Sequence, residues 1–263
     1  MKQQVQVDCE MKTVLATTIH EPQPRLLKQL RDYTPLLKLN NESMIAAYSP
    51  ETHHSVISIL EDLGYVTVQG GESIQSVYTA ALNRSLQLLP DHVFYCDLDR
   101  LIHWAKKYPE EYHGTRLMAL DYDFLMVGRT PEAFLTHPET QTCTEGIVNR
   151  IASKTIGFEA TKDVVGTCWG LSRPLTQLLA SSLELNTYGF YCGWPVTAWR
   201  SAKRKTYTEV NGLEWETPDR YEAEIAAQGY AEWLNGFTNN REWKRRCSML
   251  DDFVQTFLRL IAE

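Results

Sequence analysis

The sequence lacks long apolar runs, clustered cysteines and an excess of basic charge. Its apolar stretches are far shorter than the 18 or more residues of a membrane span, so no transmembrane segment is expected. The six cysteines are scattered without a C-x-x-C pair, which is typical of reduced thiols in the cytoplasm. A net charge of -7 argues against nucleic acid as a partner. These absences predict an acidic, cytoplasmic globular protein.

The chain also lacks repeats, low-complexity segments and an obvious linker. Its 263 residues, 43% of them hydrophobic, are enough to bury a substantial core. The first ten residues, MKQQVQVDCE, have no apolar stretch of the kind found in signal peptides, and we predict a disordered polar lead-in there. We predict one α/β domain over residues 11–220 and a helical C-terminal extension over 221–263 that packs on the same domain.

Strand-like and helix-like patterns alternate through the first half of the chain. β-branched or apolar runs at 13–19, 43–49, 65–71 and 92–97 predict strands, and a helical pattern follows each of the first three. Repeated strand–helix alternation favours right-handed crossover units. We therefore predict a mostly parallel central sheet with helices on both faces, in which these four strands are neighbours.

Several helix boundaries follow from local signals. Ser49 followed by Pro50 predicts an N-cap and a first helical turn, and Thr130-Pro131 predicts another helix start. Thr142-x-x-Glu145 has the pattern of a capping box. The aromatic and glycine-rich stretch 186–200 has no clean period, and its aromatics predict either a stacking platform or a packed corner. Helical patterns dominate from Tyr221 onward, with these expected buried residues: Trp233, Leu234, Met249, Phe253, Phe257 and Leu260.

Asp97 and Asp99 end the fourth predicted strand, at the edge of a parallel sheet where ligands bind. If both residues extend the strand, their carboxylates point the same way and suit an octahedral Mg²⁺ or Mn²⁺ ion. Alternatively, Asp99 caps a helix that begins at Arg100 or Leu101. A second D-x-D, Asp121-Tyr122-Asp123, precedes its strand and is predicted to be a turn.

This order of elements, ending in Asp97-x-Asp99, resembles the A-type (GT-A) fold of nucleotide-diphospho-sugar glycosyltransferases. Within that fold it is most similar to the family 2 type, which includes dolichyl-phosphate mannose synthase, over roughly residues 11 to 200. The resemblance implies a Rossmann-like fold and metal-dependent transfer of a sugar from a nucleotide-diphosphate donor to an acceptor. Residues 11–220 would then form the nucleotide-sugar-binding and catalytic domain.

The resemblance also assigns site residues. The nucleotide-sugar-binding positions of the family correspond to Thr17, Thr18, Glu21, Ser49, Glu51, Gly71, Arg84, Asp97 and Arg173. Glu51 stands where the family has Asp. Asp97 and Asp99 correspond to the metal ligands.

The family usually has a catalytic acid late in the domain, but the equivalent stretch YGFYCGWPVTAWR contains no Asp or Glu. Glu145 is the leading candidate to replace this acid, and the other candidates are Asp163, Glu184 and His137. The predicted catalytic residues are therefore Asp99 and Glu145. The missing acid leaves open an inactive nucleotide-sugar-binding protein. A nucleotidyltransferase ranks lower, because His20-Glu21-Pro22 stands where such enzymes have a glycine-rich basic loop.

Overall fold

The computed structural model describes residues 11–39, 42–182 and 187–262, so the predicted lead-in at 1–10 lies outside the described residues. The strands of the described part form one seven-stranded sheet in the order β3-β2-β1-β4-β6-β5-β7. In chain order, the strands are β1 Thr13–Ile19, β2 Ser43–Tyr48, β3 Tyr65–Gln69, β4 His92–Cys96, β5 Phe124–Arg129, β6 Cys168–Ser172 and β7 Lys205–Val210.

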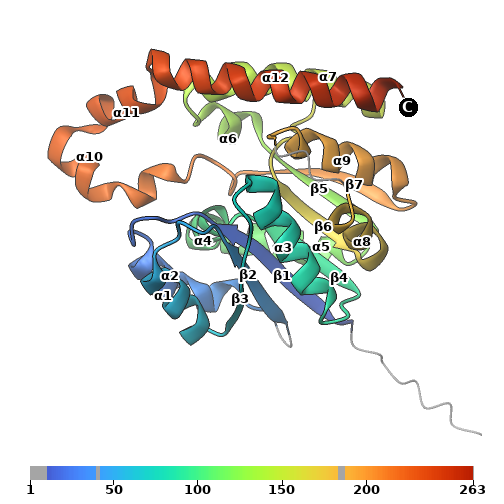
Figure 1. Cartoon of the computed structure of the whole chain (residues 1–263), viewed down its shortest axis with the longest axis horizontal. Helices are drawn as coiled ribbons and strands as arrows, with labels where there is room; N and C mark the ends of the chain where they lie inside the picture. The colour runs from blue at the N-terminus through green and yellow to red at the C-terminus, as the bar shows by residue number, and fades with distance from the viewer. Residues whose placement is uncertain (1–10, 40–41, 183–186, 263) are drawn as a thin grey trace, which may run out of the picture.

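Helices connect these strands and continue to the end of the described chain (Figure 1). They are α1 Leu27–Leu37, α2 His54–Asp62, α3 Ile74–Leu86, α4 Leu98–Lys107, α5 Pro109–Ala119, α6 Pro131–Leu135, α7 Glu139–Ile156, α8 Arg173–Ala180, α9 Phe190–Ser201, η1 Thr217–Arg220, α10 Glu222–Gln228, α11 Tyr230–Thr238 and α12 Asn240–Ala262. The prediction of a Rossmann-like α/β fold with a mostly parallel sheet and a helical C-terminal extension is confirmed.

The four predicted strands are neighbours that pair in parallel. β2 pairs with β1 and β3, and β1 also pairs with β4, all in parallel. By contrast, β6 is antiparallel to both β4 and β5, while β5 and β7 are parallel. The carboxyl ends of the other strands therefore lie at one edge of the sheet, and β6 begins at that same edge.

The sheet separates two hydrophobic cores. In β1, Val14 and Ala16 face one core, and Leu15 and Ile19 face the other, as the alternation of side chains along a strand requires. Helices α3, α7, α8, α9 and α12 contribute to the first core, and α1, α2, α4 and α5 to the second. This sandwich buries the central strands on both faces.

The C-terminal helix α12 packs against α7 and α9. Met249, Phe253 and Phe257, spaced four residues apart, are buried as predicted, and so is Trp233 of α11. Leu234 and Leu260 are only half-buried. Figure 1 shows α12 lying across the molecule beside α7, with α10 and α11 forming an arm that projects from the body. The division of the chain at residue 220 stays a prediction.

The start of α2 differs from its prediction. The helix begins at His54 with His53 at the N-cap position, so Ser49 is not a cap. Instead, the Ser49 amide donates to the Ile19 carbonyl, and the His53 amide donates to the Glu21 carbonyl. These bonds hold residues 49–53 in a turn against the loop after β1, a long-range constraint that replaces the local helix signal.

The prediction of a capping box at Thr142 is also wrong. Helix α7 already begins at Glu139, directly after Pro138, so Thr142 and Glu145 lie inside it. The Thr142 hydroxyl donates to the Glu139 carbonyl within the helix. Thr130, in contrast, caps α6 as predicted, with its Oγ1 accepting from the Ala133 amide at 3.1 Å.

Two elements escaped the sequence patterns. The aromatic stretch forms α9, which contains Pro195 and is largely buried, so it shows no amphipathic period. The segment 205–210 forms the edge strand β7, whose Thr206, Tyr207, Thr208 and Val210 favour a strand.

The prediction that Asp97 and Asp99 extend the strand is wrong. β4 ends at Cys96 and α4 begins at Leu98, so Asp97 is at the N-cap position and Asp99 is in the first helical turn. The alternative, in which Asp99 is the cap of a later helix, is wrong as well. The two carboxylates are therefore arranged by a strand–helix junction.

In the ranges that the structure describes, no helix combines the length and apolar character needed to cross a membrane. A cytoplasmic location stays a prediction.

A tight turn after β7 directs the chain toward the carboxyl edge of the sheet. The Glu111 carboxylate accepts hydrogen bonds from the Asn211 and Gly212 amides at 3.0 and 2.9 Å. It also accepts from the Trp104 indole at 2.8 Å. A Cβ at Gly212 would lie 1.7 Å from Cδ1 of Trp104, so the backbone passes directly against the buried indole.

Gly212→Ala should therefore destabilise the protein by about 1–3 kcal/mol, because the added methyl group displaces Trp104. Gly114→Ala is the matched control: a Cβ there meets nothing within 4 Å, and an exposed helix interior should gain about 0.5–1 kcal/mol. Urea unfolding of both variants tests the pair. Equal stability of Gly212→Ala and the parent would contradict this close packing.

Candidate functional site

Two adjacent cavities lie at the carboxyl edge of the sheet and share Asp97 in their walls. The larger cavity has a volume of about 710 Å³ and lies between the ends of β1 and β2, the start of α3 and α12. The smaller cavity has a volume of about 310 Å³ and lies between α4, α7, the 215–217 segment and α12. Tyr188 and Tyr191 line both cavities, whereas Phe190 and Trp194 are buried in the core. The aromatic stretch therefore contributes to both the wall and the core.

One oxygen of Asp97 is held by three hydroxyl groups. Its Oδ1 accepts from Tyr78 at 2.6 Å, Thr18 at 2.9 Å and Tyr95 at 3.1 Å. Its Oδ2 has a longer contact, 3.4 Å, with the Thr167 hydroxyl. This arrangement fixes the orientation of the carboxylate and leaves Oδ2 as its less occupied oxygen.

Arg100 is the cation beside Asp97. Burial raises the pKa of Asp97, Arg100 opposes this shift, and Asp99 adds to it. The Arg100 Nη1 donates to Thr167 Oγ1 at 2.6 Å, and its Nε lies 3.9 Å from Oε2 of Glu216. Arg100 therefore connects Asp97 with a second buried carboxylate from the C-terminal segment.

Asp99 is bound by Arg220. The Asp99 Oδ1 accepts from the Arg100 amide at 2.9 Å, and its Oδ2 is ion-paired with Nη2 of Arg220. The Nη1 of Arg220 lies 3.2 Å from Oε2 of Glu21. Burial raises the pKa of Glu21, and Arg220 opposes that shift. Asp99 and Glu21 thus share one guanidinium group, which the C-terminal segment supplies.

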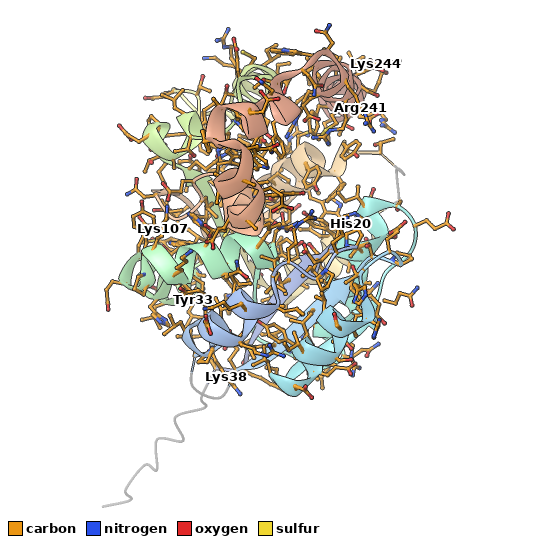
Figure 2. The ribbon with its side chains drawn as sticks, turned by 90° about the vertical axis from the view of Figure 1, so that its left-hand side faces the viewer. His20, Tyr33, Lys38, Lys107, Arg241 and Lys244 are labelled. Carbon is orange, nitrogen blue, oxygen red and sulfur yellow. The ribbon has the colours of Figure 1, made fainter. Side chains whose placement is uncertain are left out.

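The loops after β1 and β2 meet at the rim of the larger cavity. Ser49 Oγ lies 2.8 Å from Nδ1 of His20, and the exposed Glu51 carboxylate lies 3.9 Å from the same nitrogen. Figure 2 shows His20 at the level where the N-terminal elements meet the C-terminal helices. Thr17, in contrast, is fully buried in β1, and its hydroxyl has no hydrogen-bond partner among the described residues.

Gly70 and Gly71 allow the chain to pass close to the first turns of α3. A Cβ at Gly70 would lie 2.5 Å from the Val77 Cα, and one at Gly71 would lie 2.7 Å from Ser76 Oγ. Ser73 caps the helix by accepting from the Ser76 amide at 3.1 Å. The two glycines therefore set the path of the turn from which Glu72 and Ser73 line the larger cavity.

The structure does not bring all predicted residues together. Those that line the larger cavity are Thr18, Ser49, Glu51, Asp97 and Asp99. Arg84 is near the far end of α3 and binds the Gln87 side chain. Arg173 follows β6, whose antiparallel direction places it at the opposite edge of the sheet, where its amide donates to the Asp91 carbonyl.

The candidate bases occupy different environments. Glu145 lines the smaller cavity, and its two oxygens contact Arg129 at 2.6 Å and Arg246 at 3.4 Å. His137 lines the same cavity. Glu184 lies outside the described residues.

Asp163 belongs to a buried ion pair. Its Oδ2 and Oδ1 accept from Arg129 Nε and Nη2 at 2.6 and 2.9 Å, and Asn149 donates to Oδ1 at 2.7 Å. Burial alone would raise the pKa of Asp163, but Arg129 and the hydrogen bonds outweigh it and the pKa is lowered. Asp163 therefore has a structural role, because both of its oxygens already accept hydrogen bonds.

Sequence reasoning missed Tyr78, Tyr95, Glu216 and Arg220. Tyr95 could have been found, because it lies two residues before Asp97 on the approach to the strand end. Glu216 and Arg220 carry no local signal. Across the described ranges, no group of three or more His, Cys, Asp and Glu side chains is arranged to hold a metal ion.

Asp163→Asn should cost about 3–5 kcal/mol, because it leaves the buried Arg129 without its charged partner. Asp62→Asn, at the exposed end of α2, should change stability by less than about 0.5 kcal/mol. Since the pKa of Asp163 is lowered on folding, its contribution is present at neutral pH and is lost as pH falls through the folded-state pKa. Urea titrations of both variants at several pH values test this. A neutral effect of Asp163→Asn would contradict a structural role.

No protein-family model and no curated protein matches the chain. Among solved structures, it is similar to glucosyl-3-phosphoglycerate synthase from Mycobacterium tuberculosis, with 12% identity, 95% of this chain and 81% of that chain covered, and a TM-score of 0.59.

A complex of that enzyme with Mn²⁺, uridine diphosphate and phosphoglyceric acid has a TM-score of 0.58 at 12% identity, covering 95% of this chain and 78% of that one. The chain is also similar to 4-diphosphocytidyl-2C-methyl-D-erythritol synthase from Anaerococcus prevotii, with a TM-score of 0.50, 11% identity, and 83% and 96% of the two chains covered. At these identities the likeness shows the fold alone, and the chain has a GT-A-like fold.

Proposed function

We propose that the protein is a metal-dependent glycosyltransferase, of the hexosyltransferase kind and similar to family 2, that moves a sugar from a nucleotide-diphosphate donor to an acceptor. The observation that carries this proposal is the oriented Asp97 carboxylate between two cavities at the carboxyl edge of a GT-A-like sheet. The solved neighbours with Mn²⁺ and uridine diphosphate support the same class of donor.

The larger cavity is the proposed donor site. Thr18, Ser49 and Glu51 line it from the ends of β1 and β2, where a nucleoside would lie. Three further predicted residues act on this site indirectly. Thr17 packs within β1, Glu21 forms an ion pair with Arg220, and Gly71 belongs to the turn before α3. Arg84 and Arg173 are too remote to touch a donor in this cavity, so we leave them out of the proposed site.

The side chains present fit a divalent cation at Asp97. Its Oδ2 has one long contact with a hydroxyl group, and carboxylate oxygens are suitable ligands for Mg²⁺ and Mn²⁺. Such an ion can be held by one or two carboxylates together with substrate phosphates. Asp99 is the proposed second ligand, but it can bind a cation directly only after it releases Arg220.

When bound, a divalent cation supplies electrostatic stabilisation of the departing nucleoside diphosphate. The chain's own residues orient the reactants around that position. Thr18, Tyr78 and Tyr95 fix the Asp97 carboxylate. Arg220 lines the donor cavity, its Nε has no hydrogen-bond partner in the described ranges, and it offers positive charge to the diphosphate.

Glu145 is the proposed catalytic base from the sequence, and Glu216 is its rival in the smaller cavity. Both carboxylates line that cavity. Glu145 is engaged by two guanidinium groups, whereas Oε2 of Glu216 has no hydrogen-bond donor among the described residues. Glu216 therefore has the more available oxygen for a proton from an acceptor hydroxyl.

Two alternatives have specific support. The ion pair between Arg220 and Asp99 favours an inactive nucleotide-sugar-binding protein, because it occupies a proposed metal ligand. The likeness to a diphosphocytidyl synthase favours a nucleotidyltransferase, although the β1 loop lacks a glycine-rich basic stretch.

Uridine or guanosine diphosphate with Mn²⁺ should raise the melting temperature, and the nucleotide without metal should raise it much less. A ligand at 100 times its Kd stabilises the folded state by about 2.7 kcal/mol, which a thermal-shift assay resolves. The absence of a shift with any nucleoside diphosphate, with metal present, would refute the proposed function.

Asp97→Asn should abolish the metal-dependent part of this shift, because the amide keeps the shape but removes the charge that binds the cation. Asp123→Asn is the matched control, since Asp123 accepts from the Lys203 and Arg204 amides in a turn. Thermal shifts with and without Mn²⁺ compare the two variants. Parent-like metal and nucleotide binding by Asp97→Asn would remove Asp97 from the metal site.

A further inference from the structure

The smaller cavity contains two buried hydrogen-bond acceptors that the described residues leave without a donor. They are Nε2 of His137 and Oε2 of Glu216, and both residues line the cavity. The residues are only 5% and 8% exposed. A buried polar atom without a partner costs free energy, so each atom is suited to a ligand that donates a hydrogen bond.

The contacts of His137 determine which ring nitrogen can accept. Its Nδ1 lies 3.2 Å from the Ala133 carbonyl, which can only accept, so Nδ1 carries the hydrogen and Nε2 presents its lone pair. Burial lowers the pKa of His137 well below its ordinary value, and Arg129, Arg100 and Arg246 add to this effect. The imidazole is therefore a neutral acceptor at physiological pH.

A hydrogen bond between neighbouring residues holds the segment of Glu216 next to the segment of His137. The Trp215 amide donates to Oγ1 of Thr136 at 2.7 Å, which joins the two segments that carry these acceptors. Among the described residues, Glu216 Oε2 forms an ion pair with Arg100, whose Nε lies 3.9 Å away. This distance is too long for a hydrogen bond. Both acceptors thus belong to one wall of the cavity.

The charges around the cavity are balanced. Three carboxylates and three guanidinium groups line it: Asp97, Glu145, Glu216, Arg100, Arg245 and Arg246. Each guanidinium already faces a carboxylate. Arg245 and Arg246 both bind Glu242, each through Nε at 2.9 Å, and Arg100 faces Glu216. An anionic ligand would have to compete with these pairs, so the cavity favours a neutral one.

Apolar and aromatic side chains form much of the remaining lining, beside the polar Gln141, Thr167 and Thr217. They include Tyr188, Tyr191, Trp215, Phe237, Met249 and Phe253. Cavities that combine apolar walls with directed polar groups bind small organic molecules. The apolar CH surfaces of a sugar ring suit such walls, while its hydroxyl groups suit the two free acceptors.

We propose that the smaller cavity is the acceptor subsite and that it takes a neutral, polyhydroxylated acceptor, such as a sugar or glycoside. Hydroxyl groups of this acceptor donate to His137 Nε2 and Glu216 Oε2. The inference rests on the proposed function, in which the adjoining larger cavity holds the donor and shares Asp97. It separates this chain from the solved neighbour that binds phosphoglyceric acid, which is an anion.

Saturation-transfer NMR with the full chain tests the class of ligand. The probes are methyl α-D-glucopyranoside, methyl α-D-mannopyranoside and 3-phosphoglycerate, each at millimolar concentration, with and without uridine diphosphate and Mn²⁺. At least one glycoside should give a signal, and 3-phosphoglycerate should give none or a weaker one. A stronger signal from 3-phosphoglycerate, or no signal from either glycoside under both conditions, would overturn the proposal.

Two variants test the location. His137→Phe removes the acceptor nitrogen, and Glu216→Gln replaces a carboxylate oxygen with an amide donor. Each should weaken glycoside binding about tenfold, the effect of losing one hydrogen bond to a ligand. His54→Phe and Glu139→Gln, at exposed positions, are the matched controls. Parent-like glycoside binding by either cavity variant, with its fold verified by circular dichroism, would overturn the assignment of its residue.

Nucleotide binding separates the two failures. If uridine diphosphate still stabilises the parent but no glycoside binds, the acceptor inference fails and the donor site stands. If glycosides bind in a His137-dependent way without any nucleotide binding, the cavity assignment stands and the proposed transferase function fails. Glu216→Gln provides an independent measurement should His137→Phe fail to fold.

Discussion

Three hydroxyl groups converge on one oxygen of Asp97, and the architecture of both cavities depends on that convergence. The hydroxyls come from β1, α3 and β4, so the carboxylate joins three elements at the edge of the sheet. A buried carboxylate is costly unless it is hydrogen-bonded and paired with a cation, and here Arg100 supplies the charge. The same bonds satisfy the buried tyrosine hydroxyls and leave Oδ2 as the less occupied oxygen of a residue that lines both cavities.

A second constraint comes from the C-terminal segment. The Glu111 carboxylate anchors the turn after β7, and the chain then brings Glu216 to Arg100 and Arg220 to Glu21 and Asp99. Arg220 lies between Glu21 and Asp99, whose mutual repulsion it relieves. The larger cavity therefore depends on a segment that lies outside the strand–helix alternation, and α12 contributes to the walls of both cavities.

The likeness to glycosyltransferases concerns the fold, and a fold supports many reactions. What distinguishes this chain is the chemistry at the carboxyl edge. Asp97 has one oxygen with only a long contact to a hydroxyl group, Asp99 is held by an internal guanidinium group, and the adjacent cavity offers acceptors rather than spare cations. Under the proposed function, transfer would go to a hydroxylated acceptor, and metal binding by Asp99 would require the release of Arg220.

Local patterns in the sequence determined the strands β1 to β4, because side-chain periodicity is a short-range property. Their parallel pairing, and the position of Asp97 at a ligand-binding edge, followed from the regular strand–helix alternation. Local patterns also determined the buried stripe of α12. Local signals failed where distant contacts compete with them. Ser49 binds His20 and does not cap a helix, and buried α9 has no polar face to reveal its period.

Only the tertiary structure decided which side chains form the site. The antiparallel direction of β6 removes Arg173 to the opposite edge, a reversal that no motif encodes. Asp99 and Arg220 are 121 positions apart in the chain, and their pairing depends on how the whole C-terminal segment folds back. Charge pairing acts through space, so a single sequence shows which residues can ionise, whereas the fold decides which of them meet.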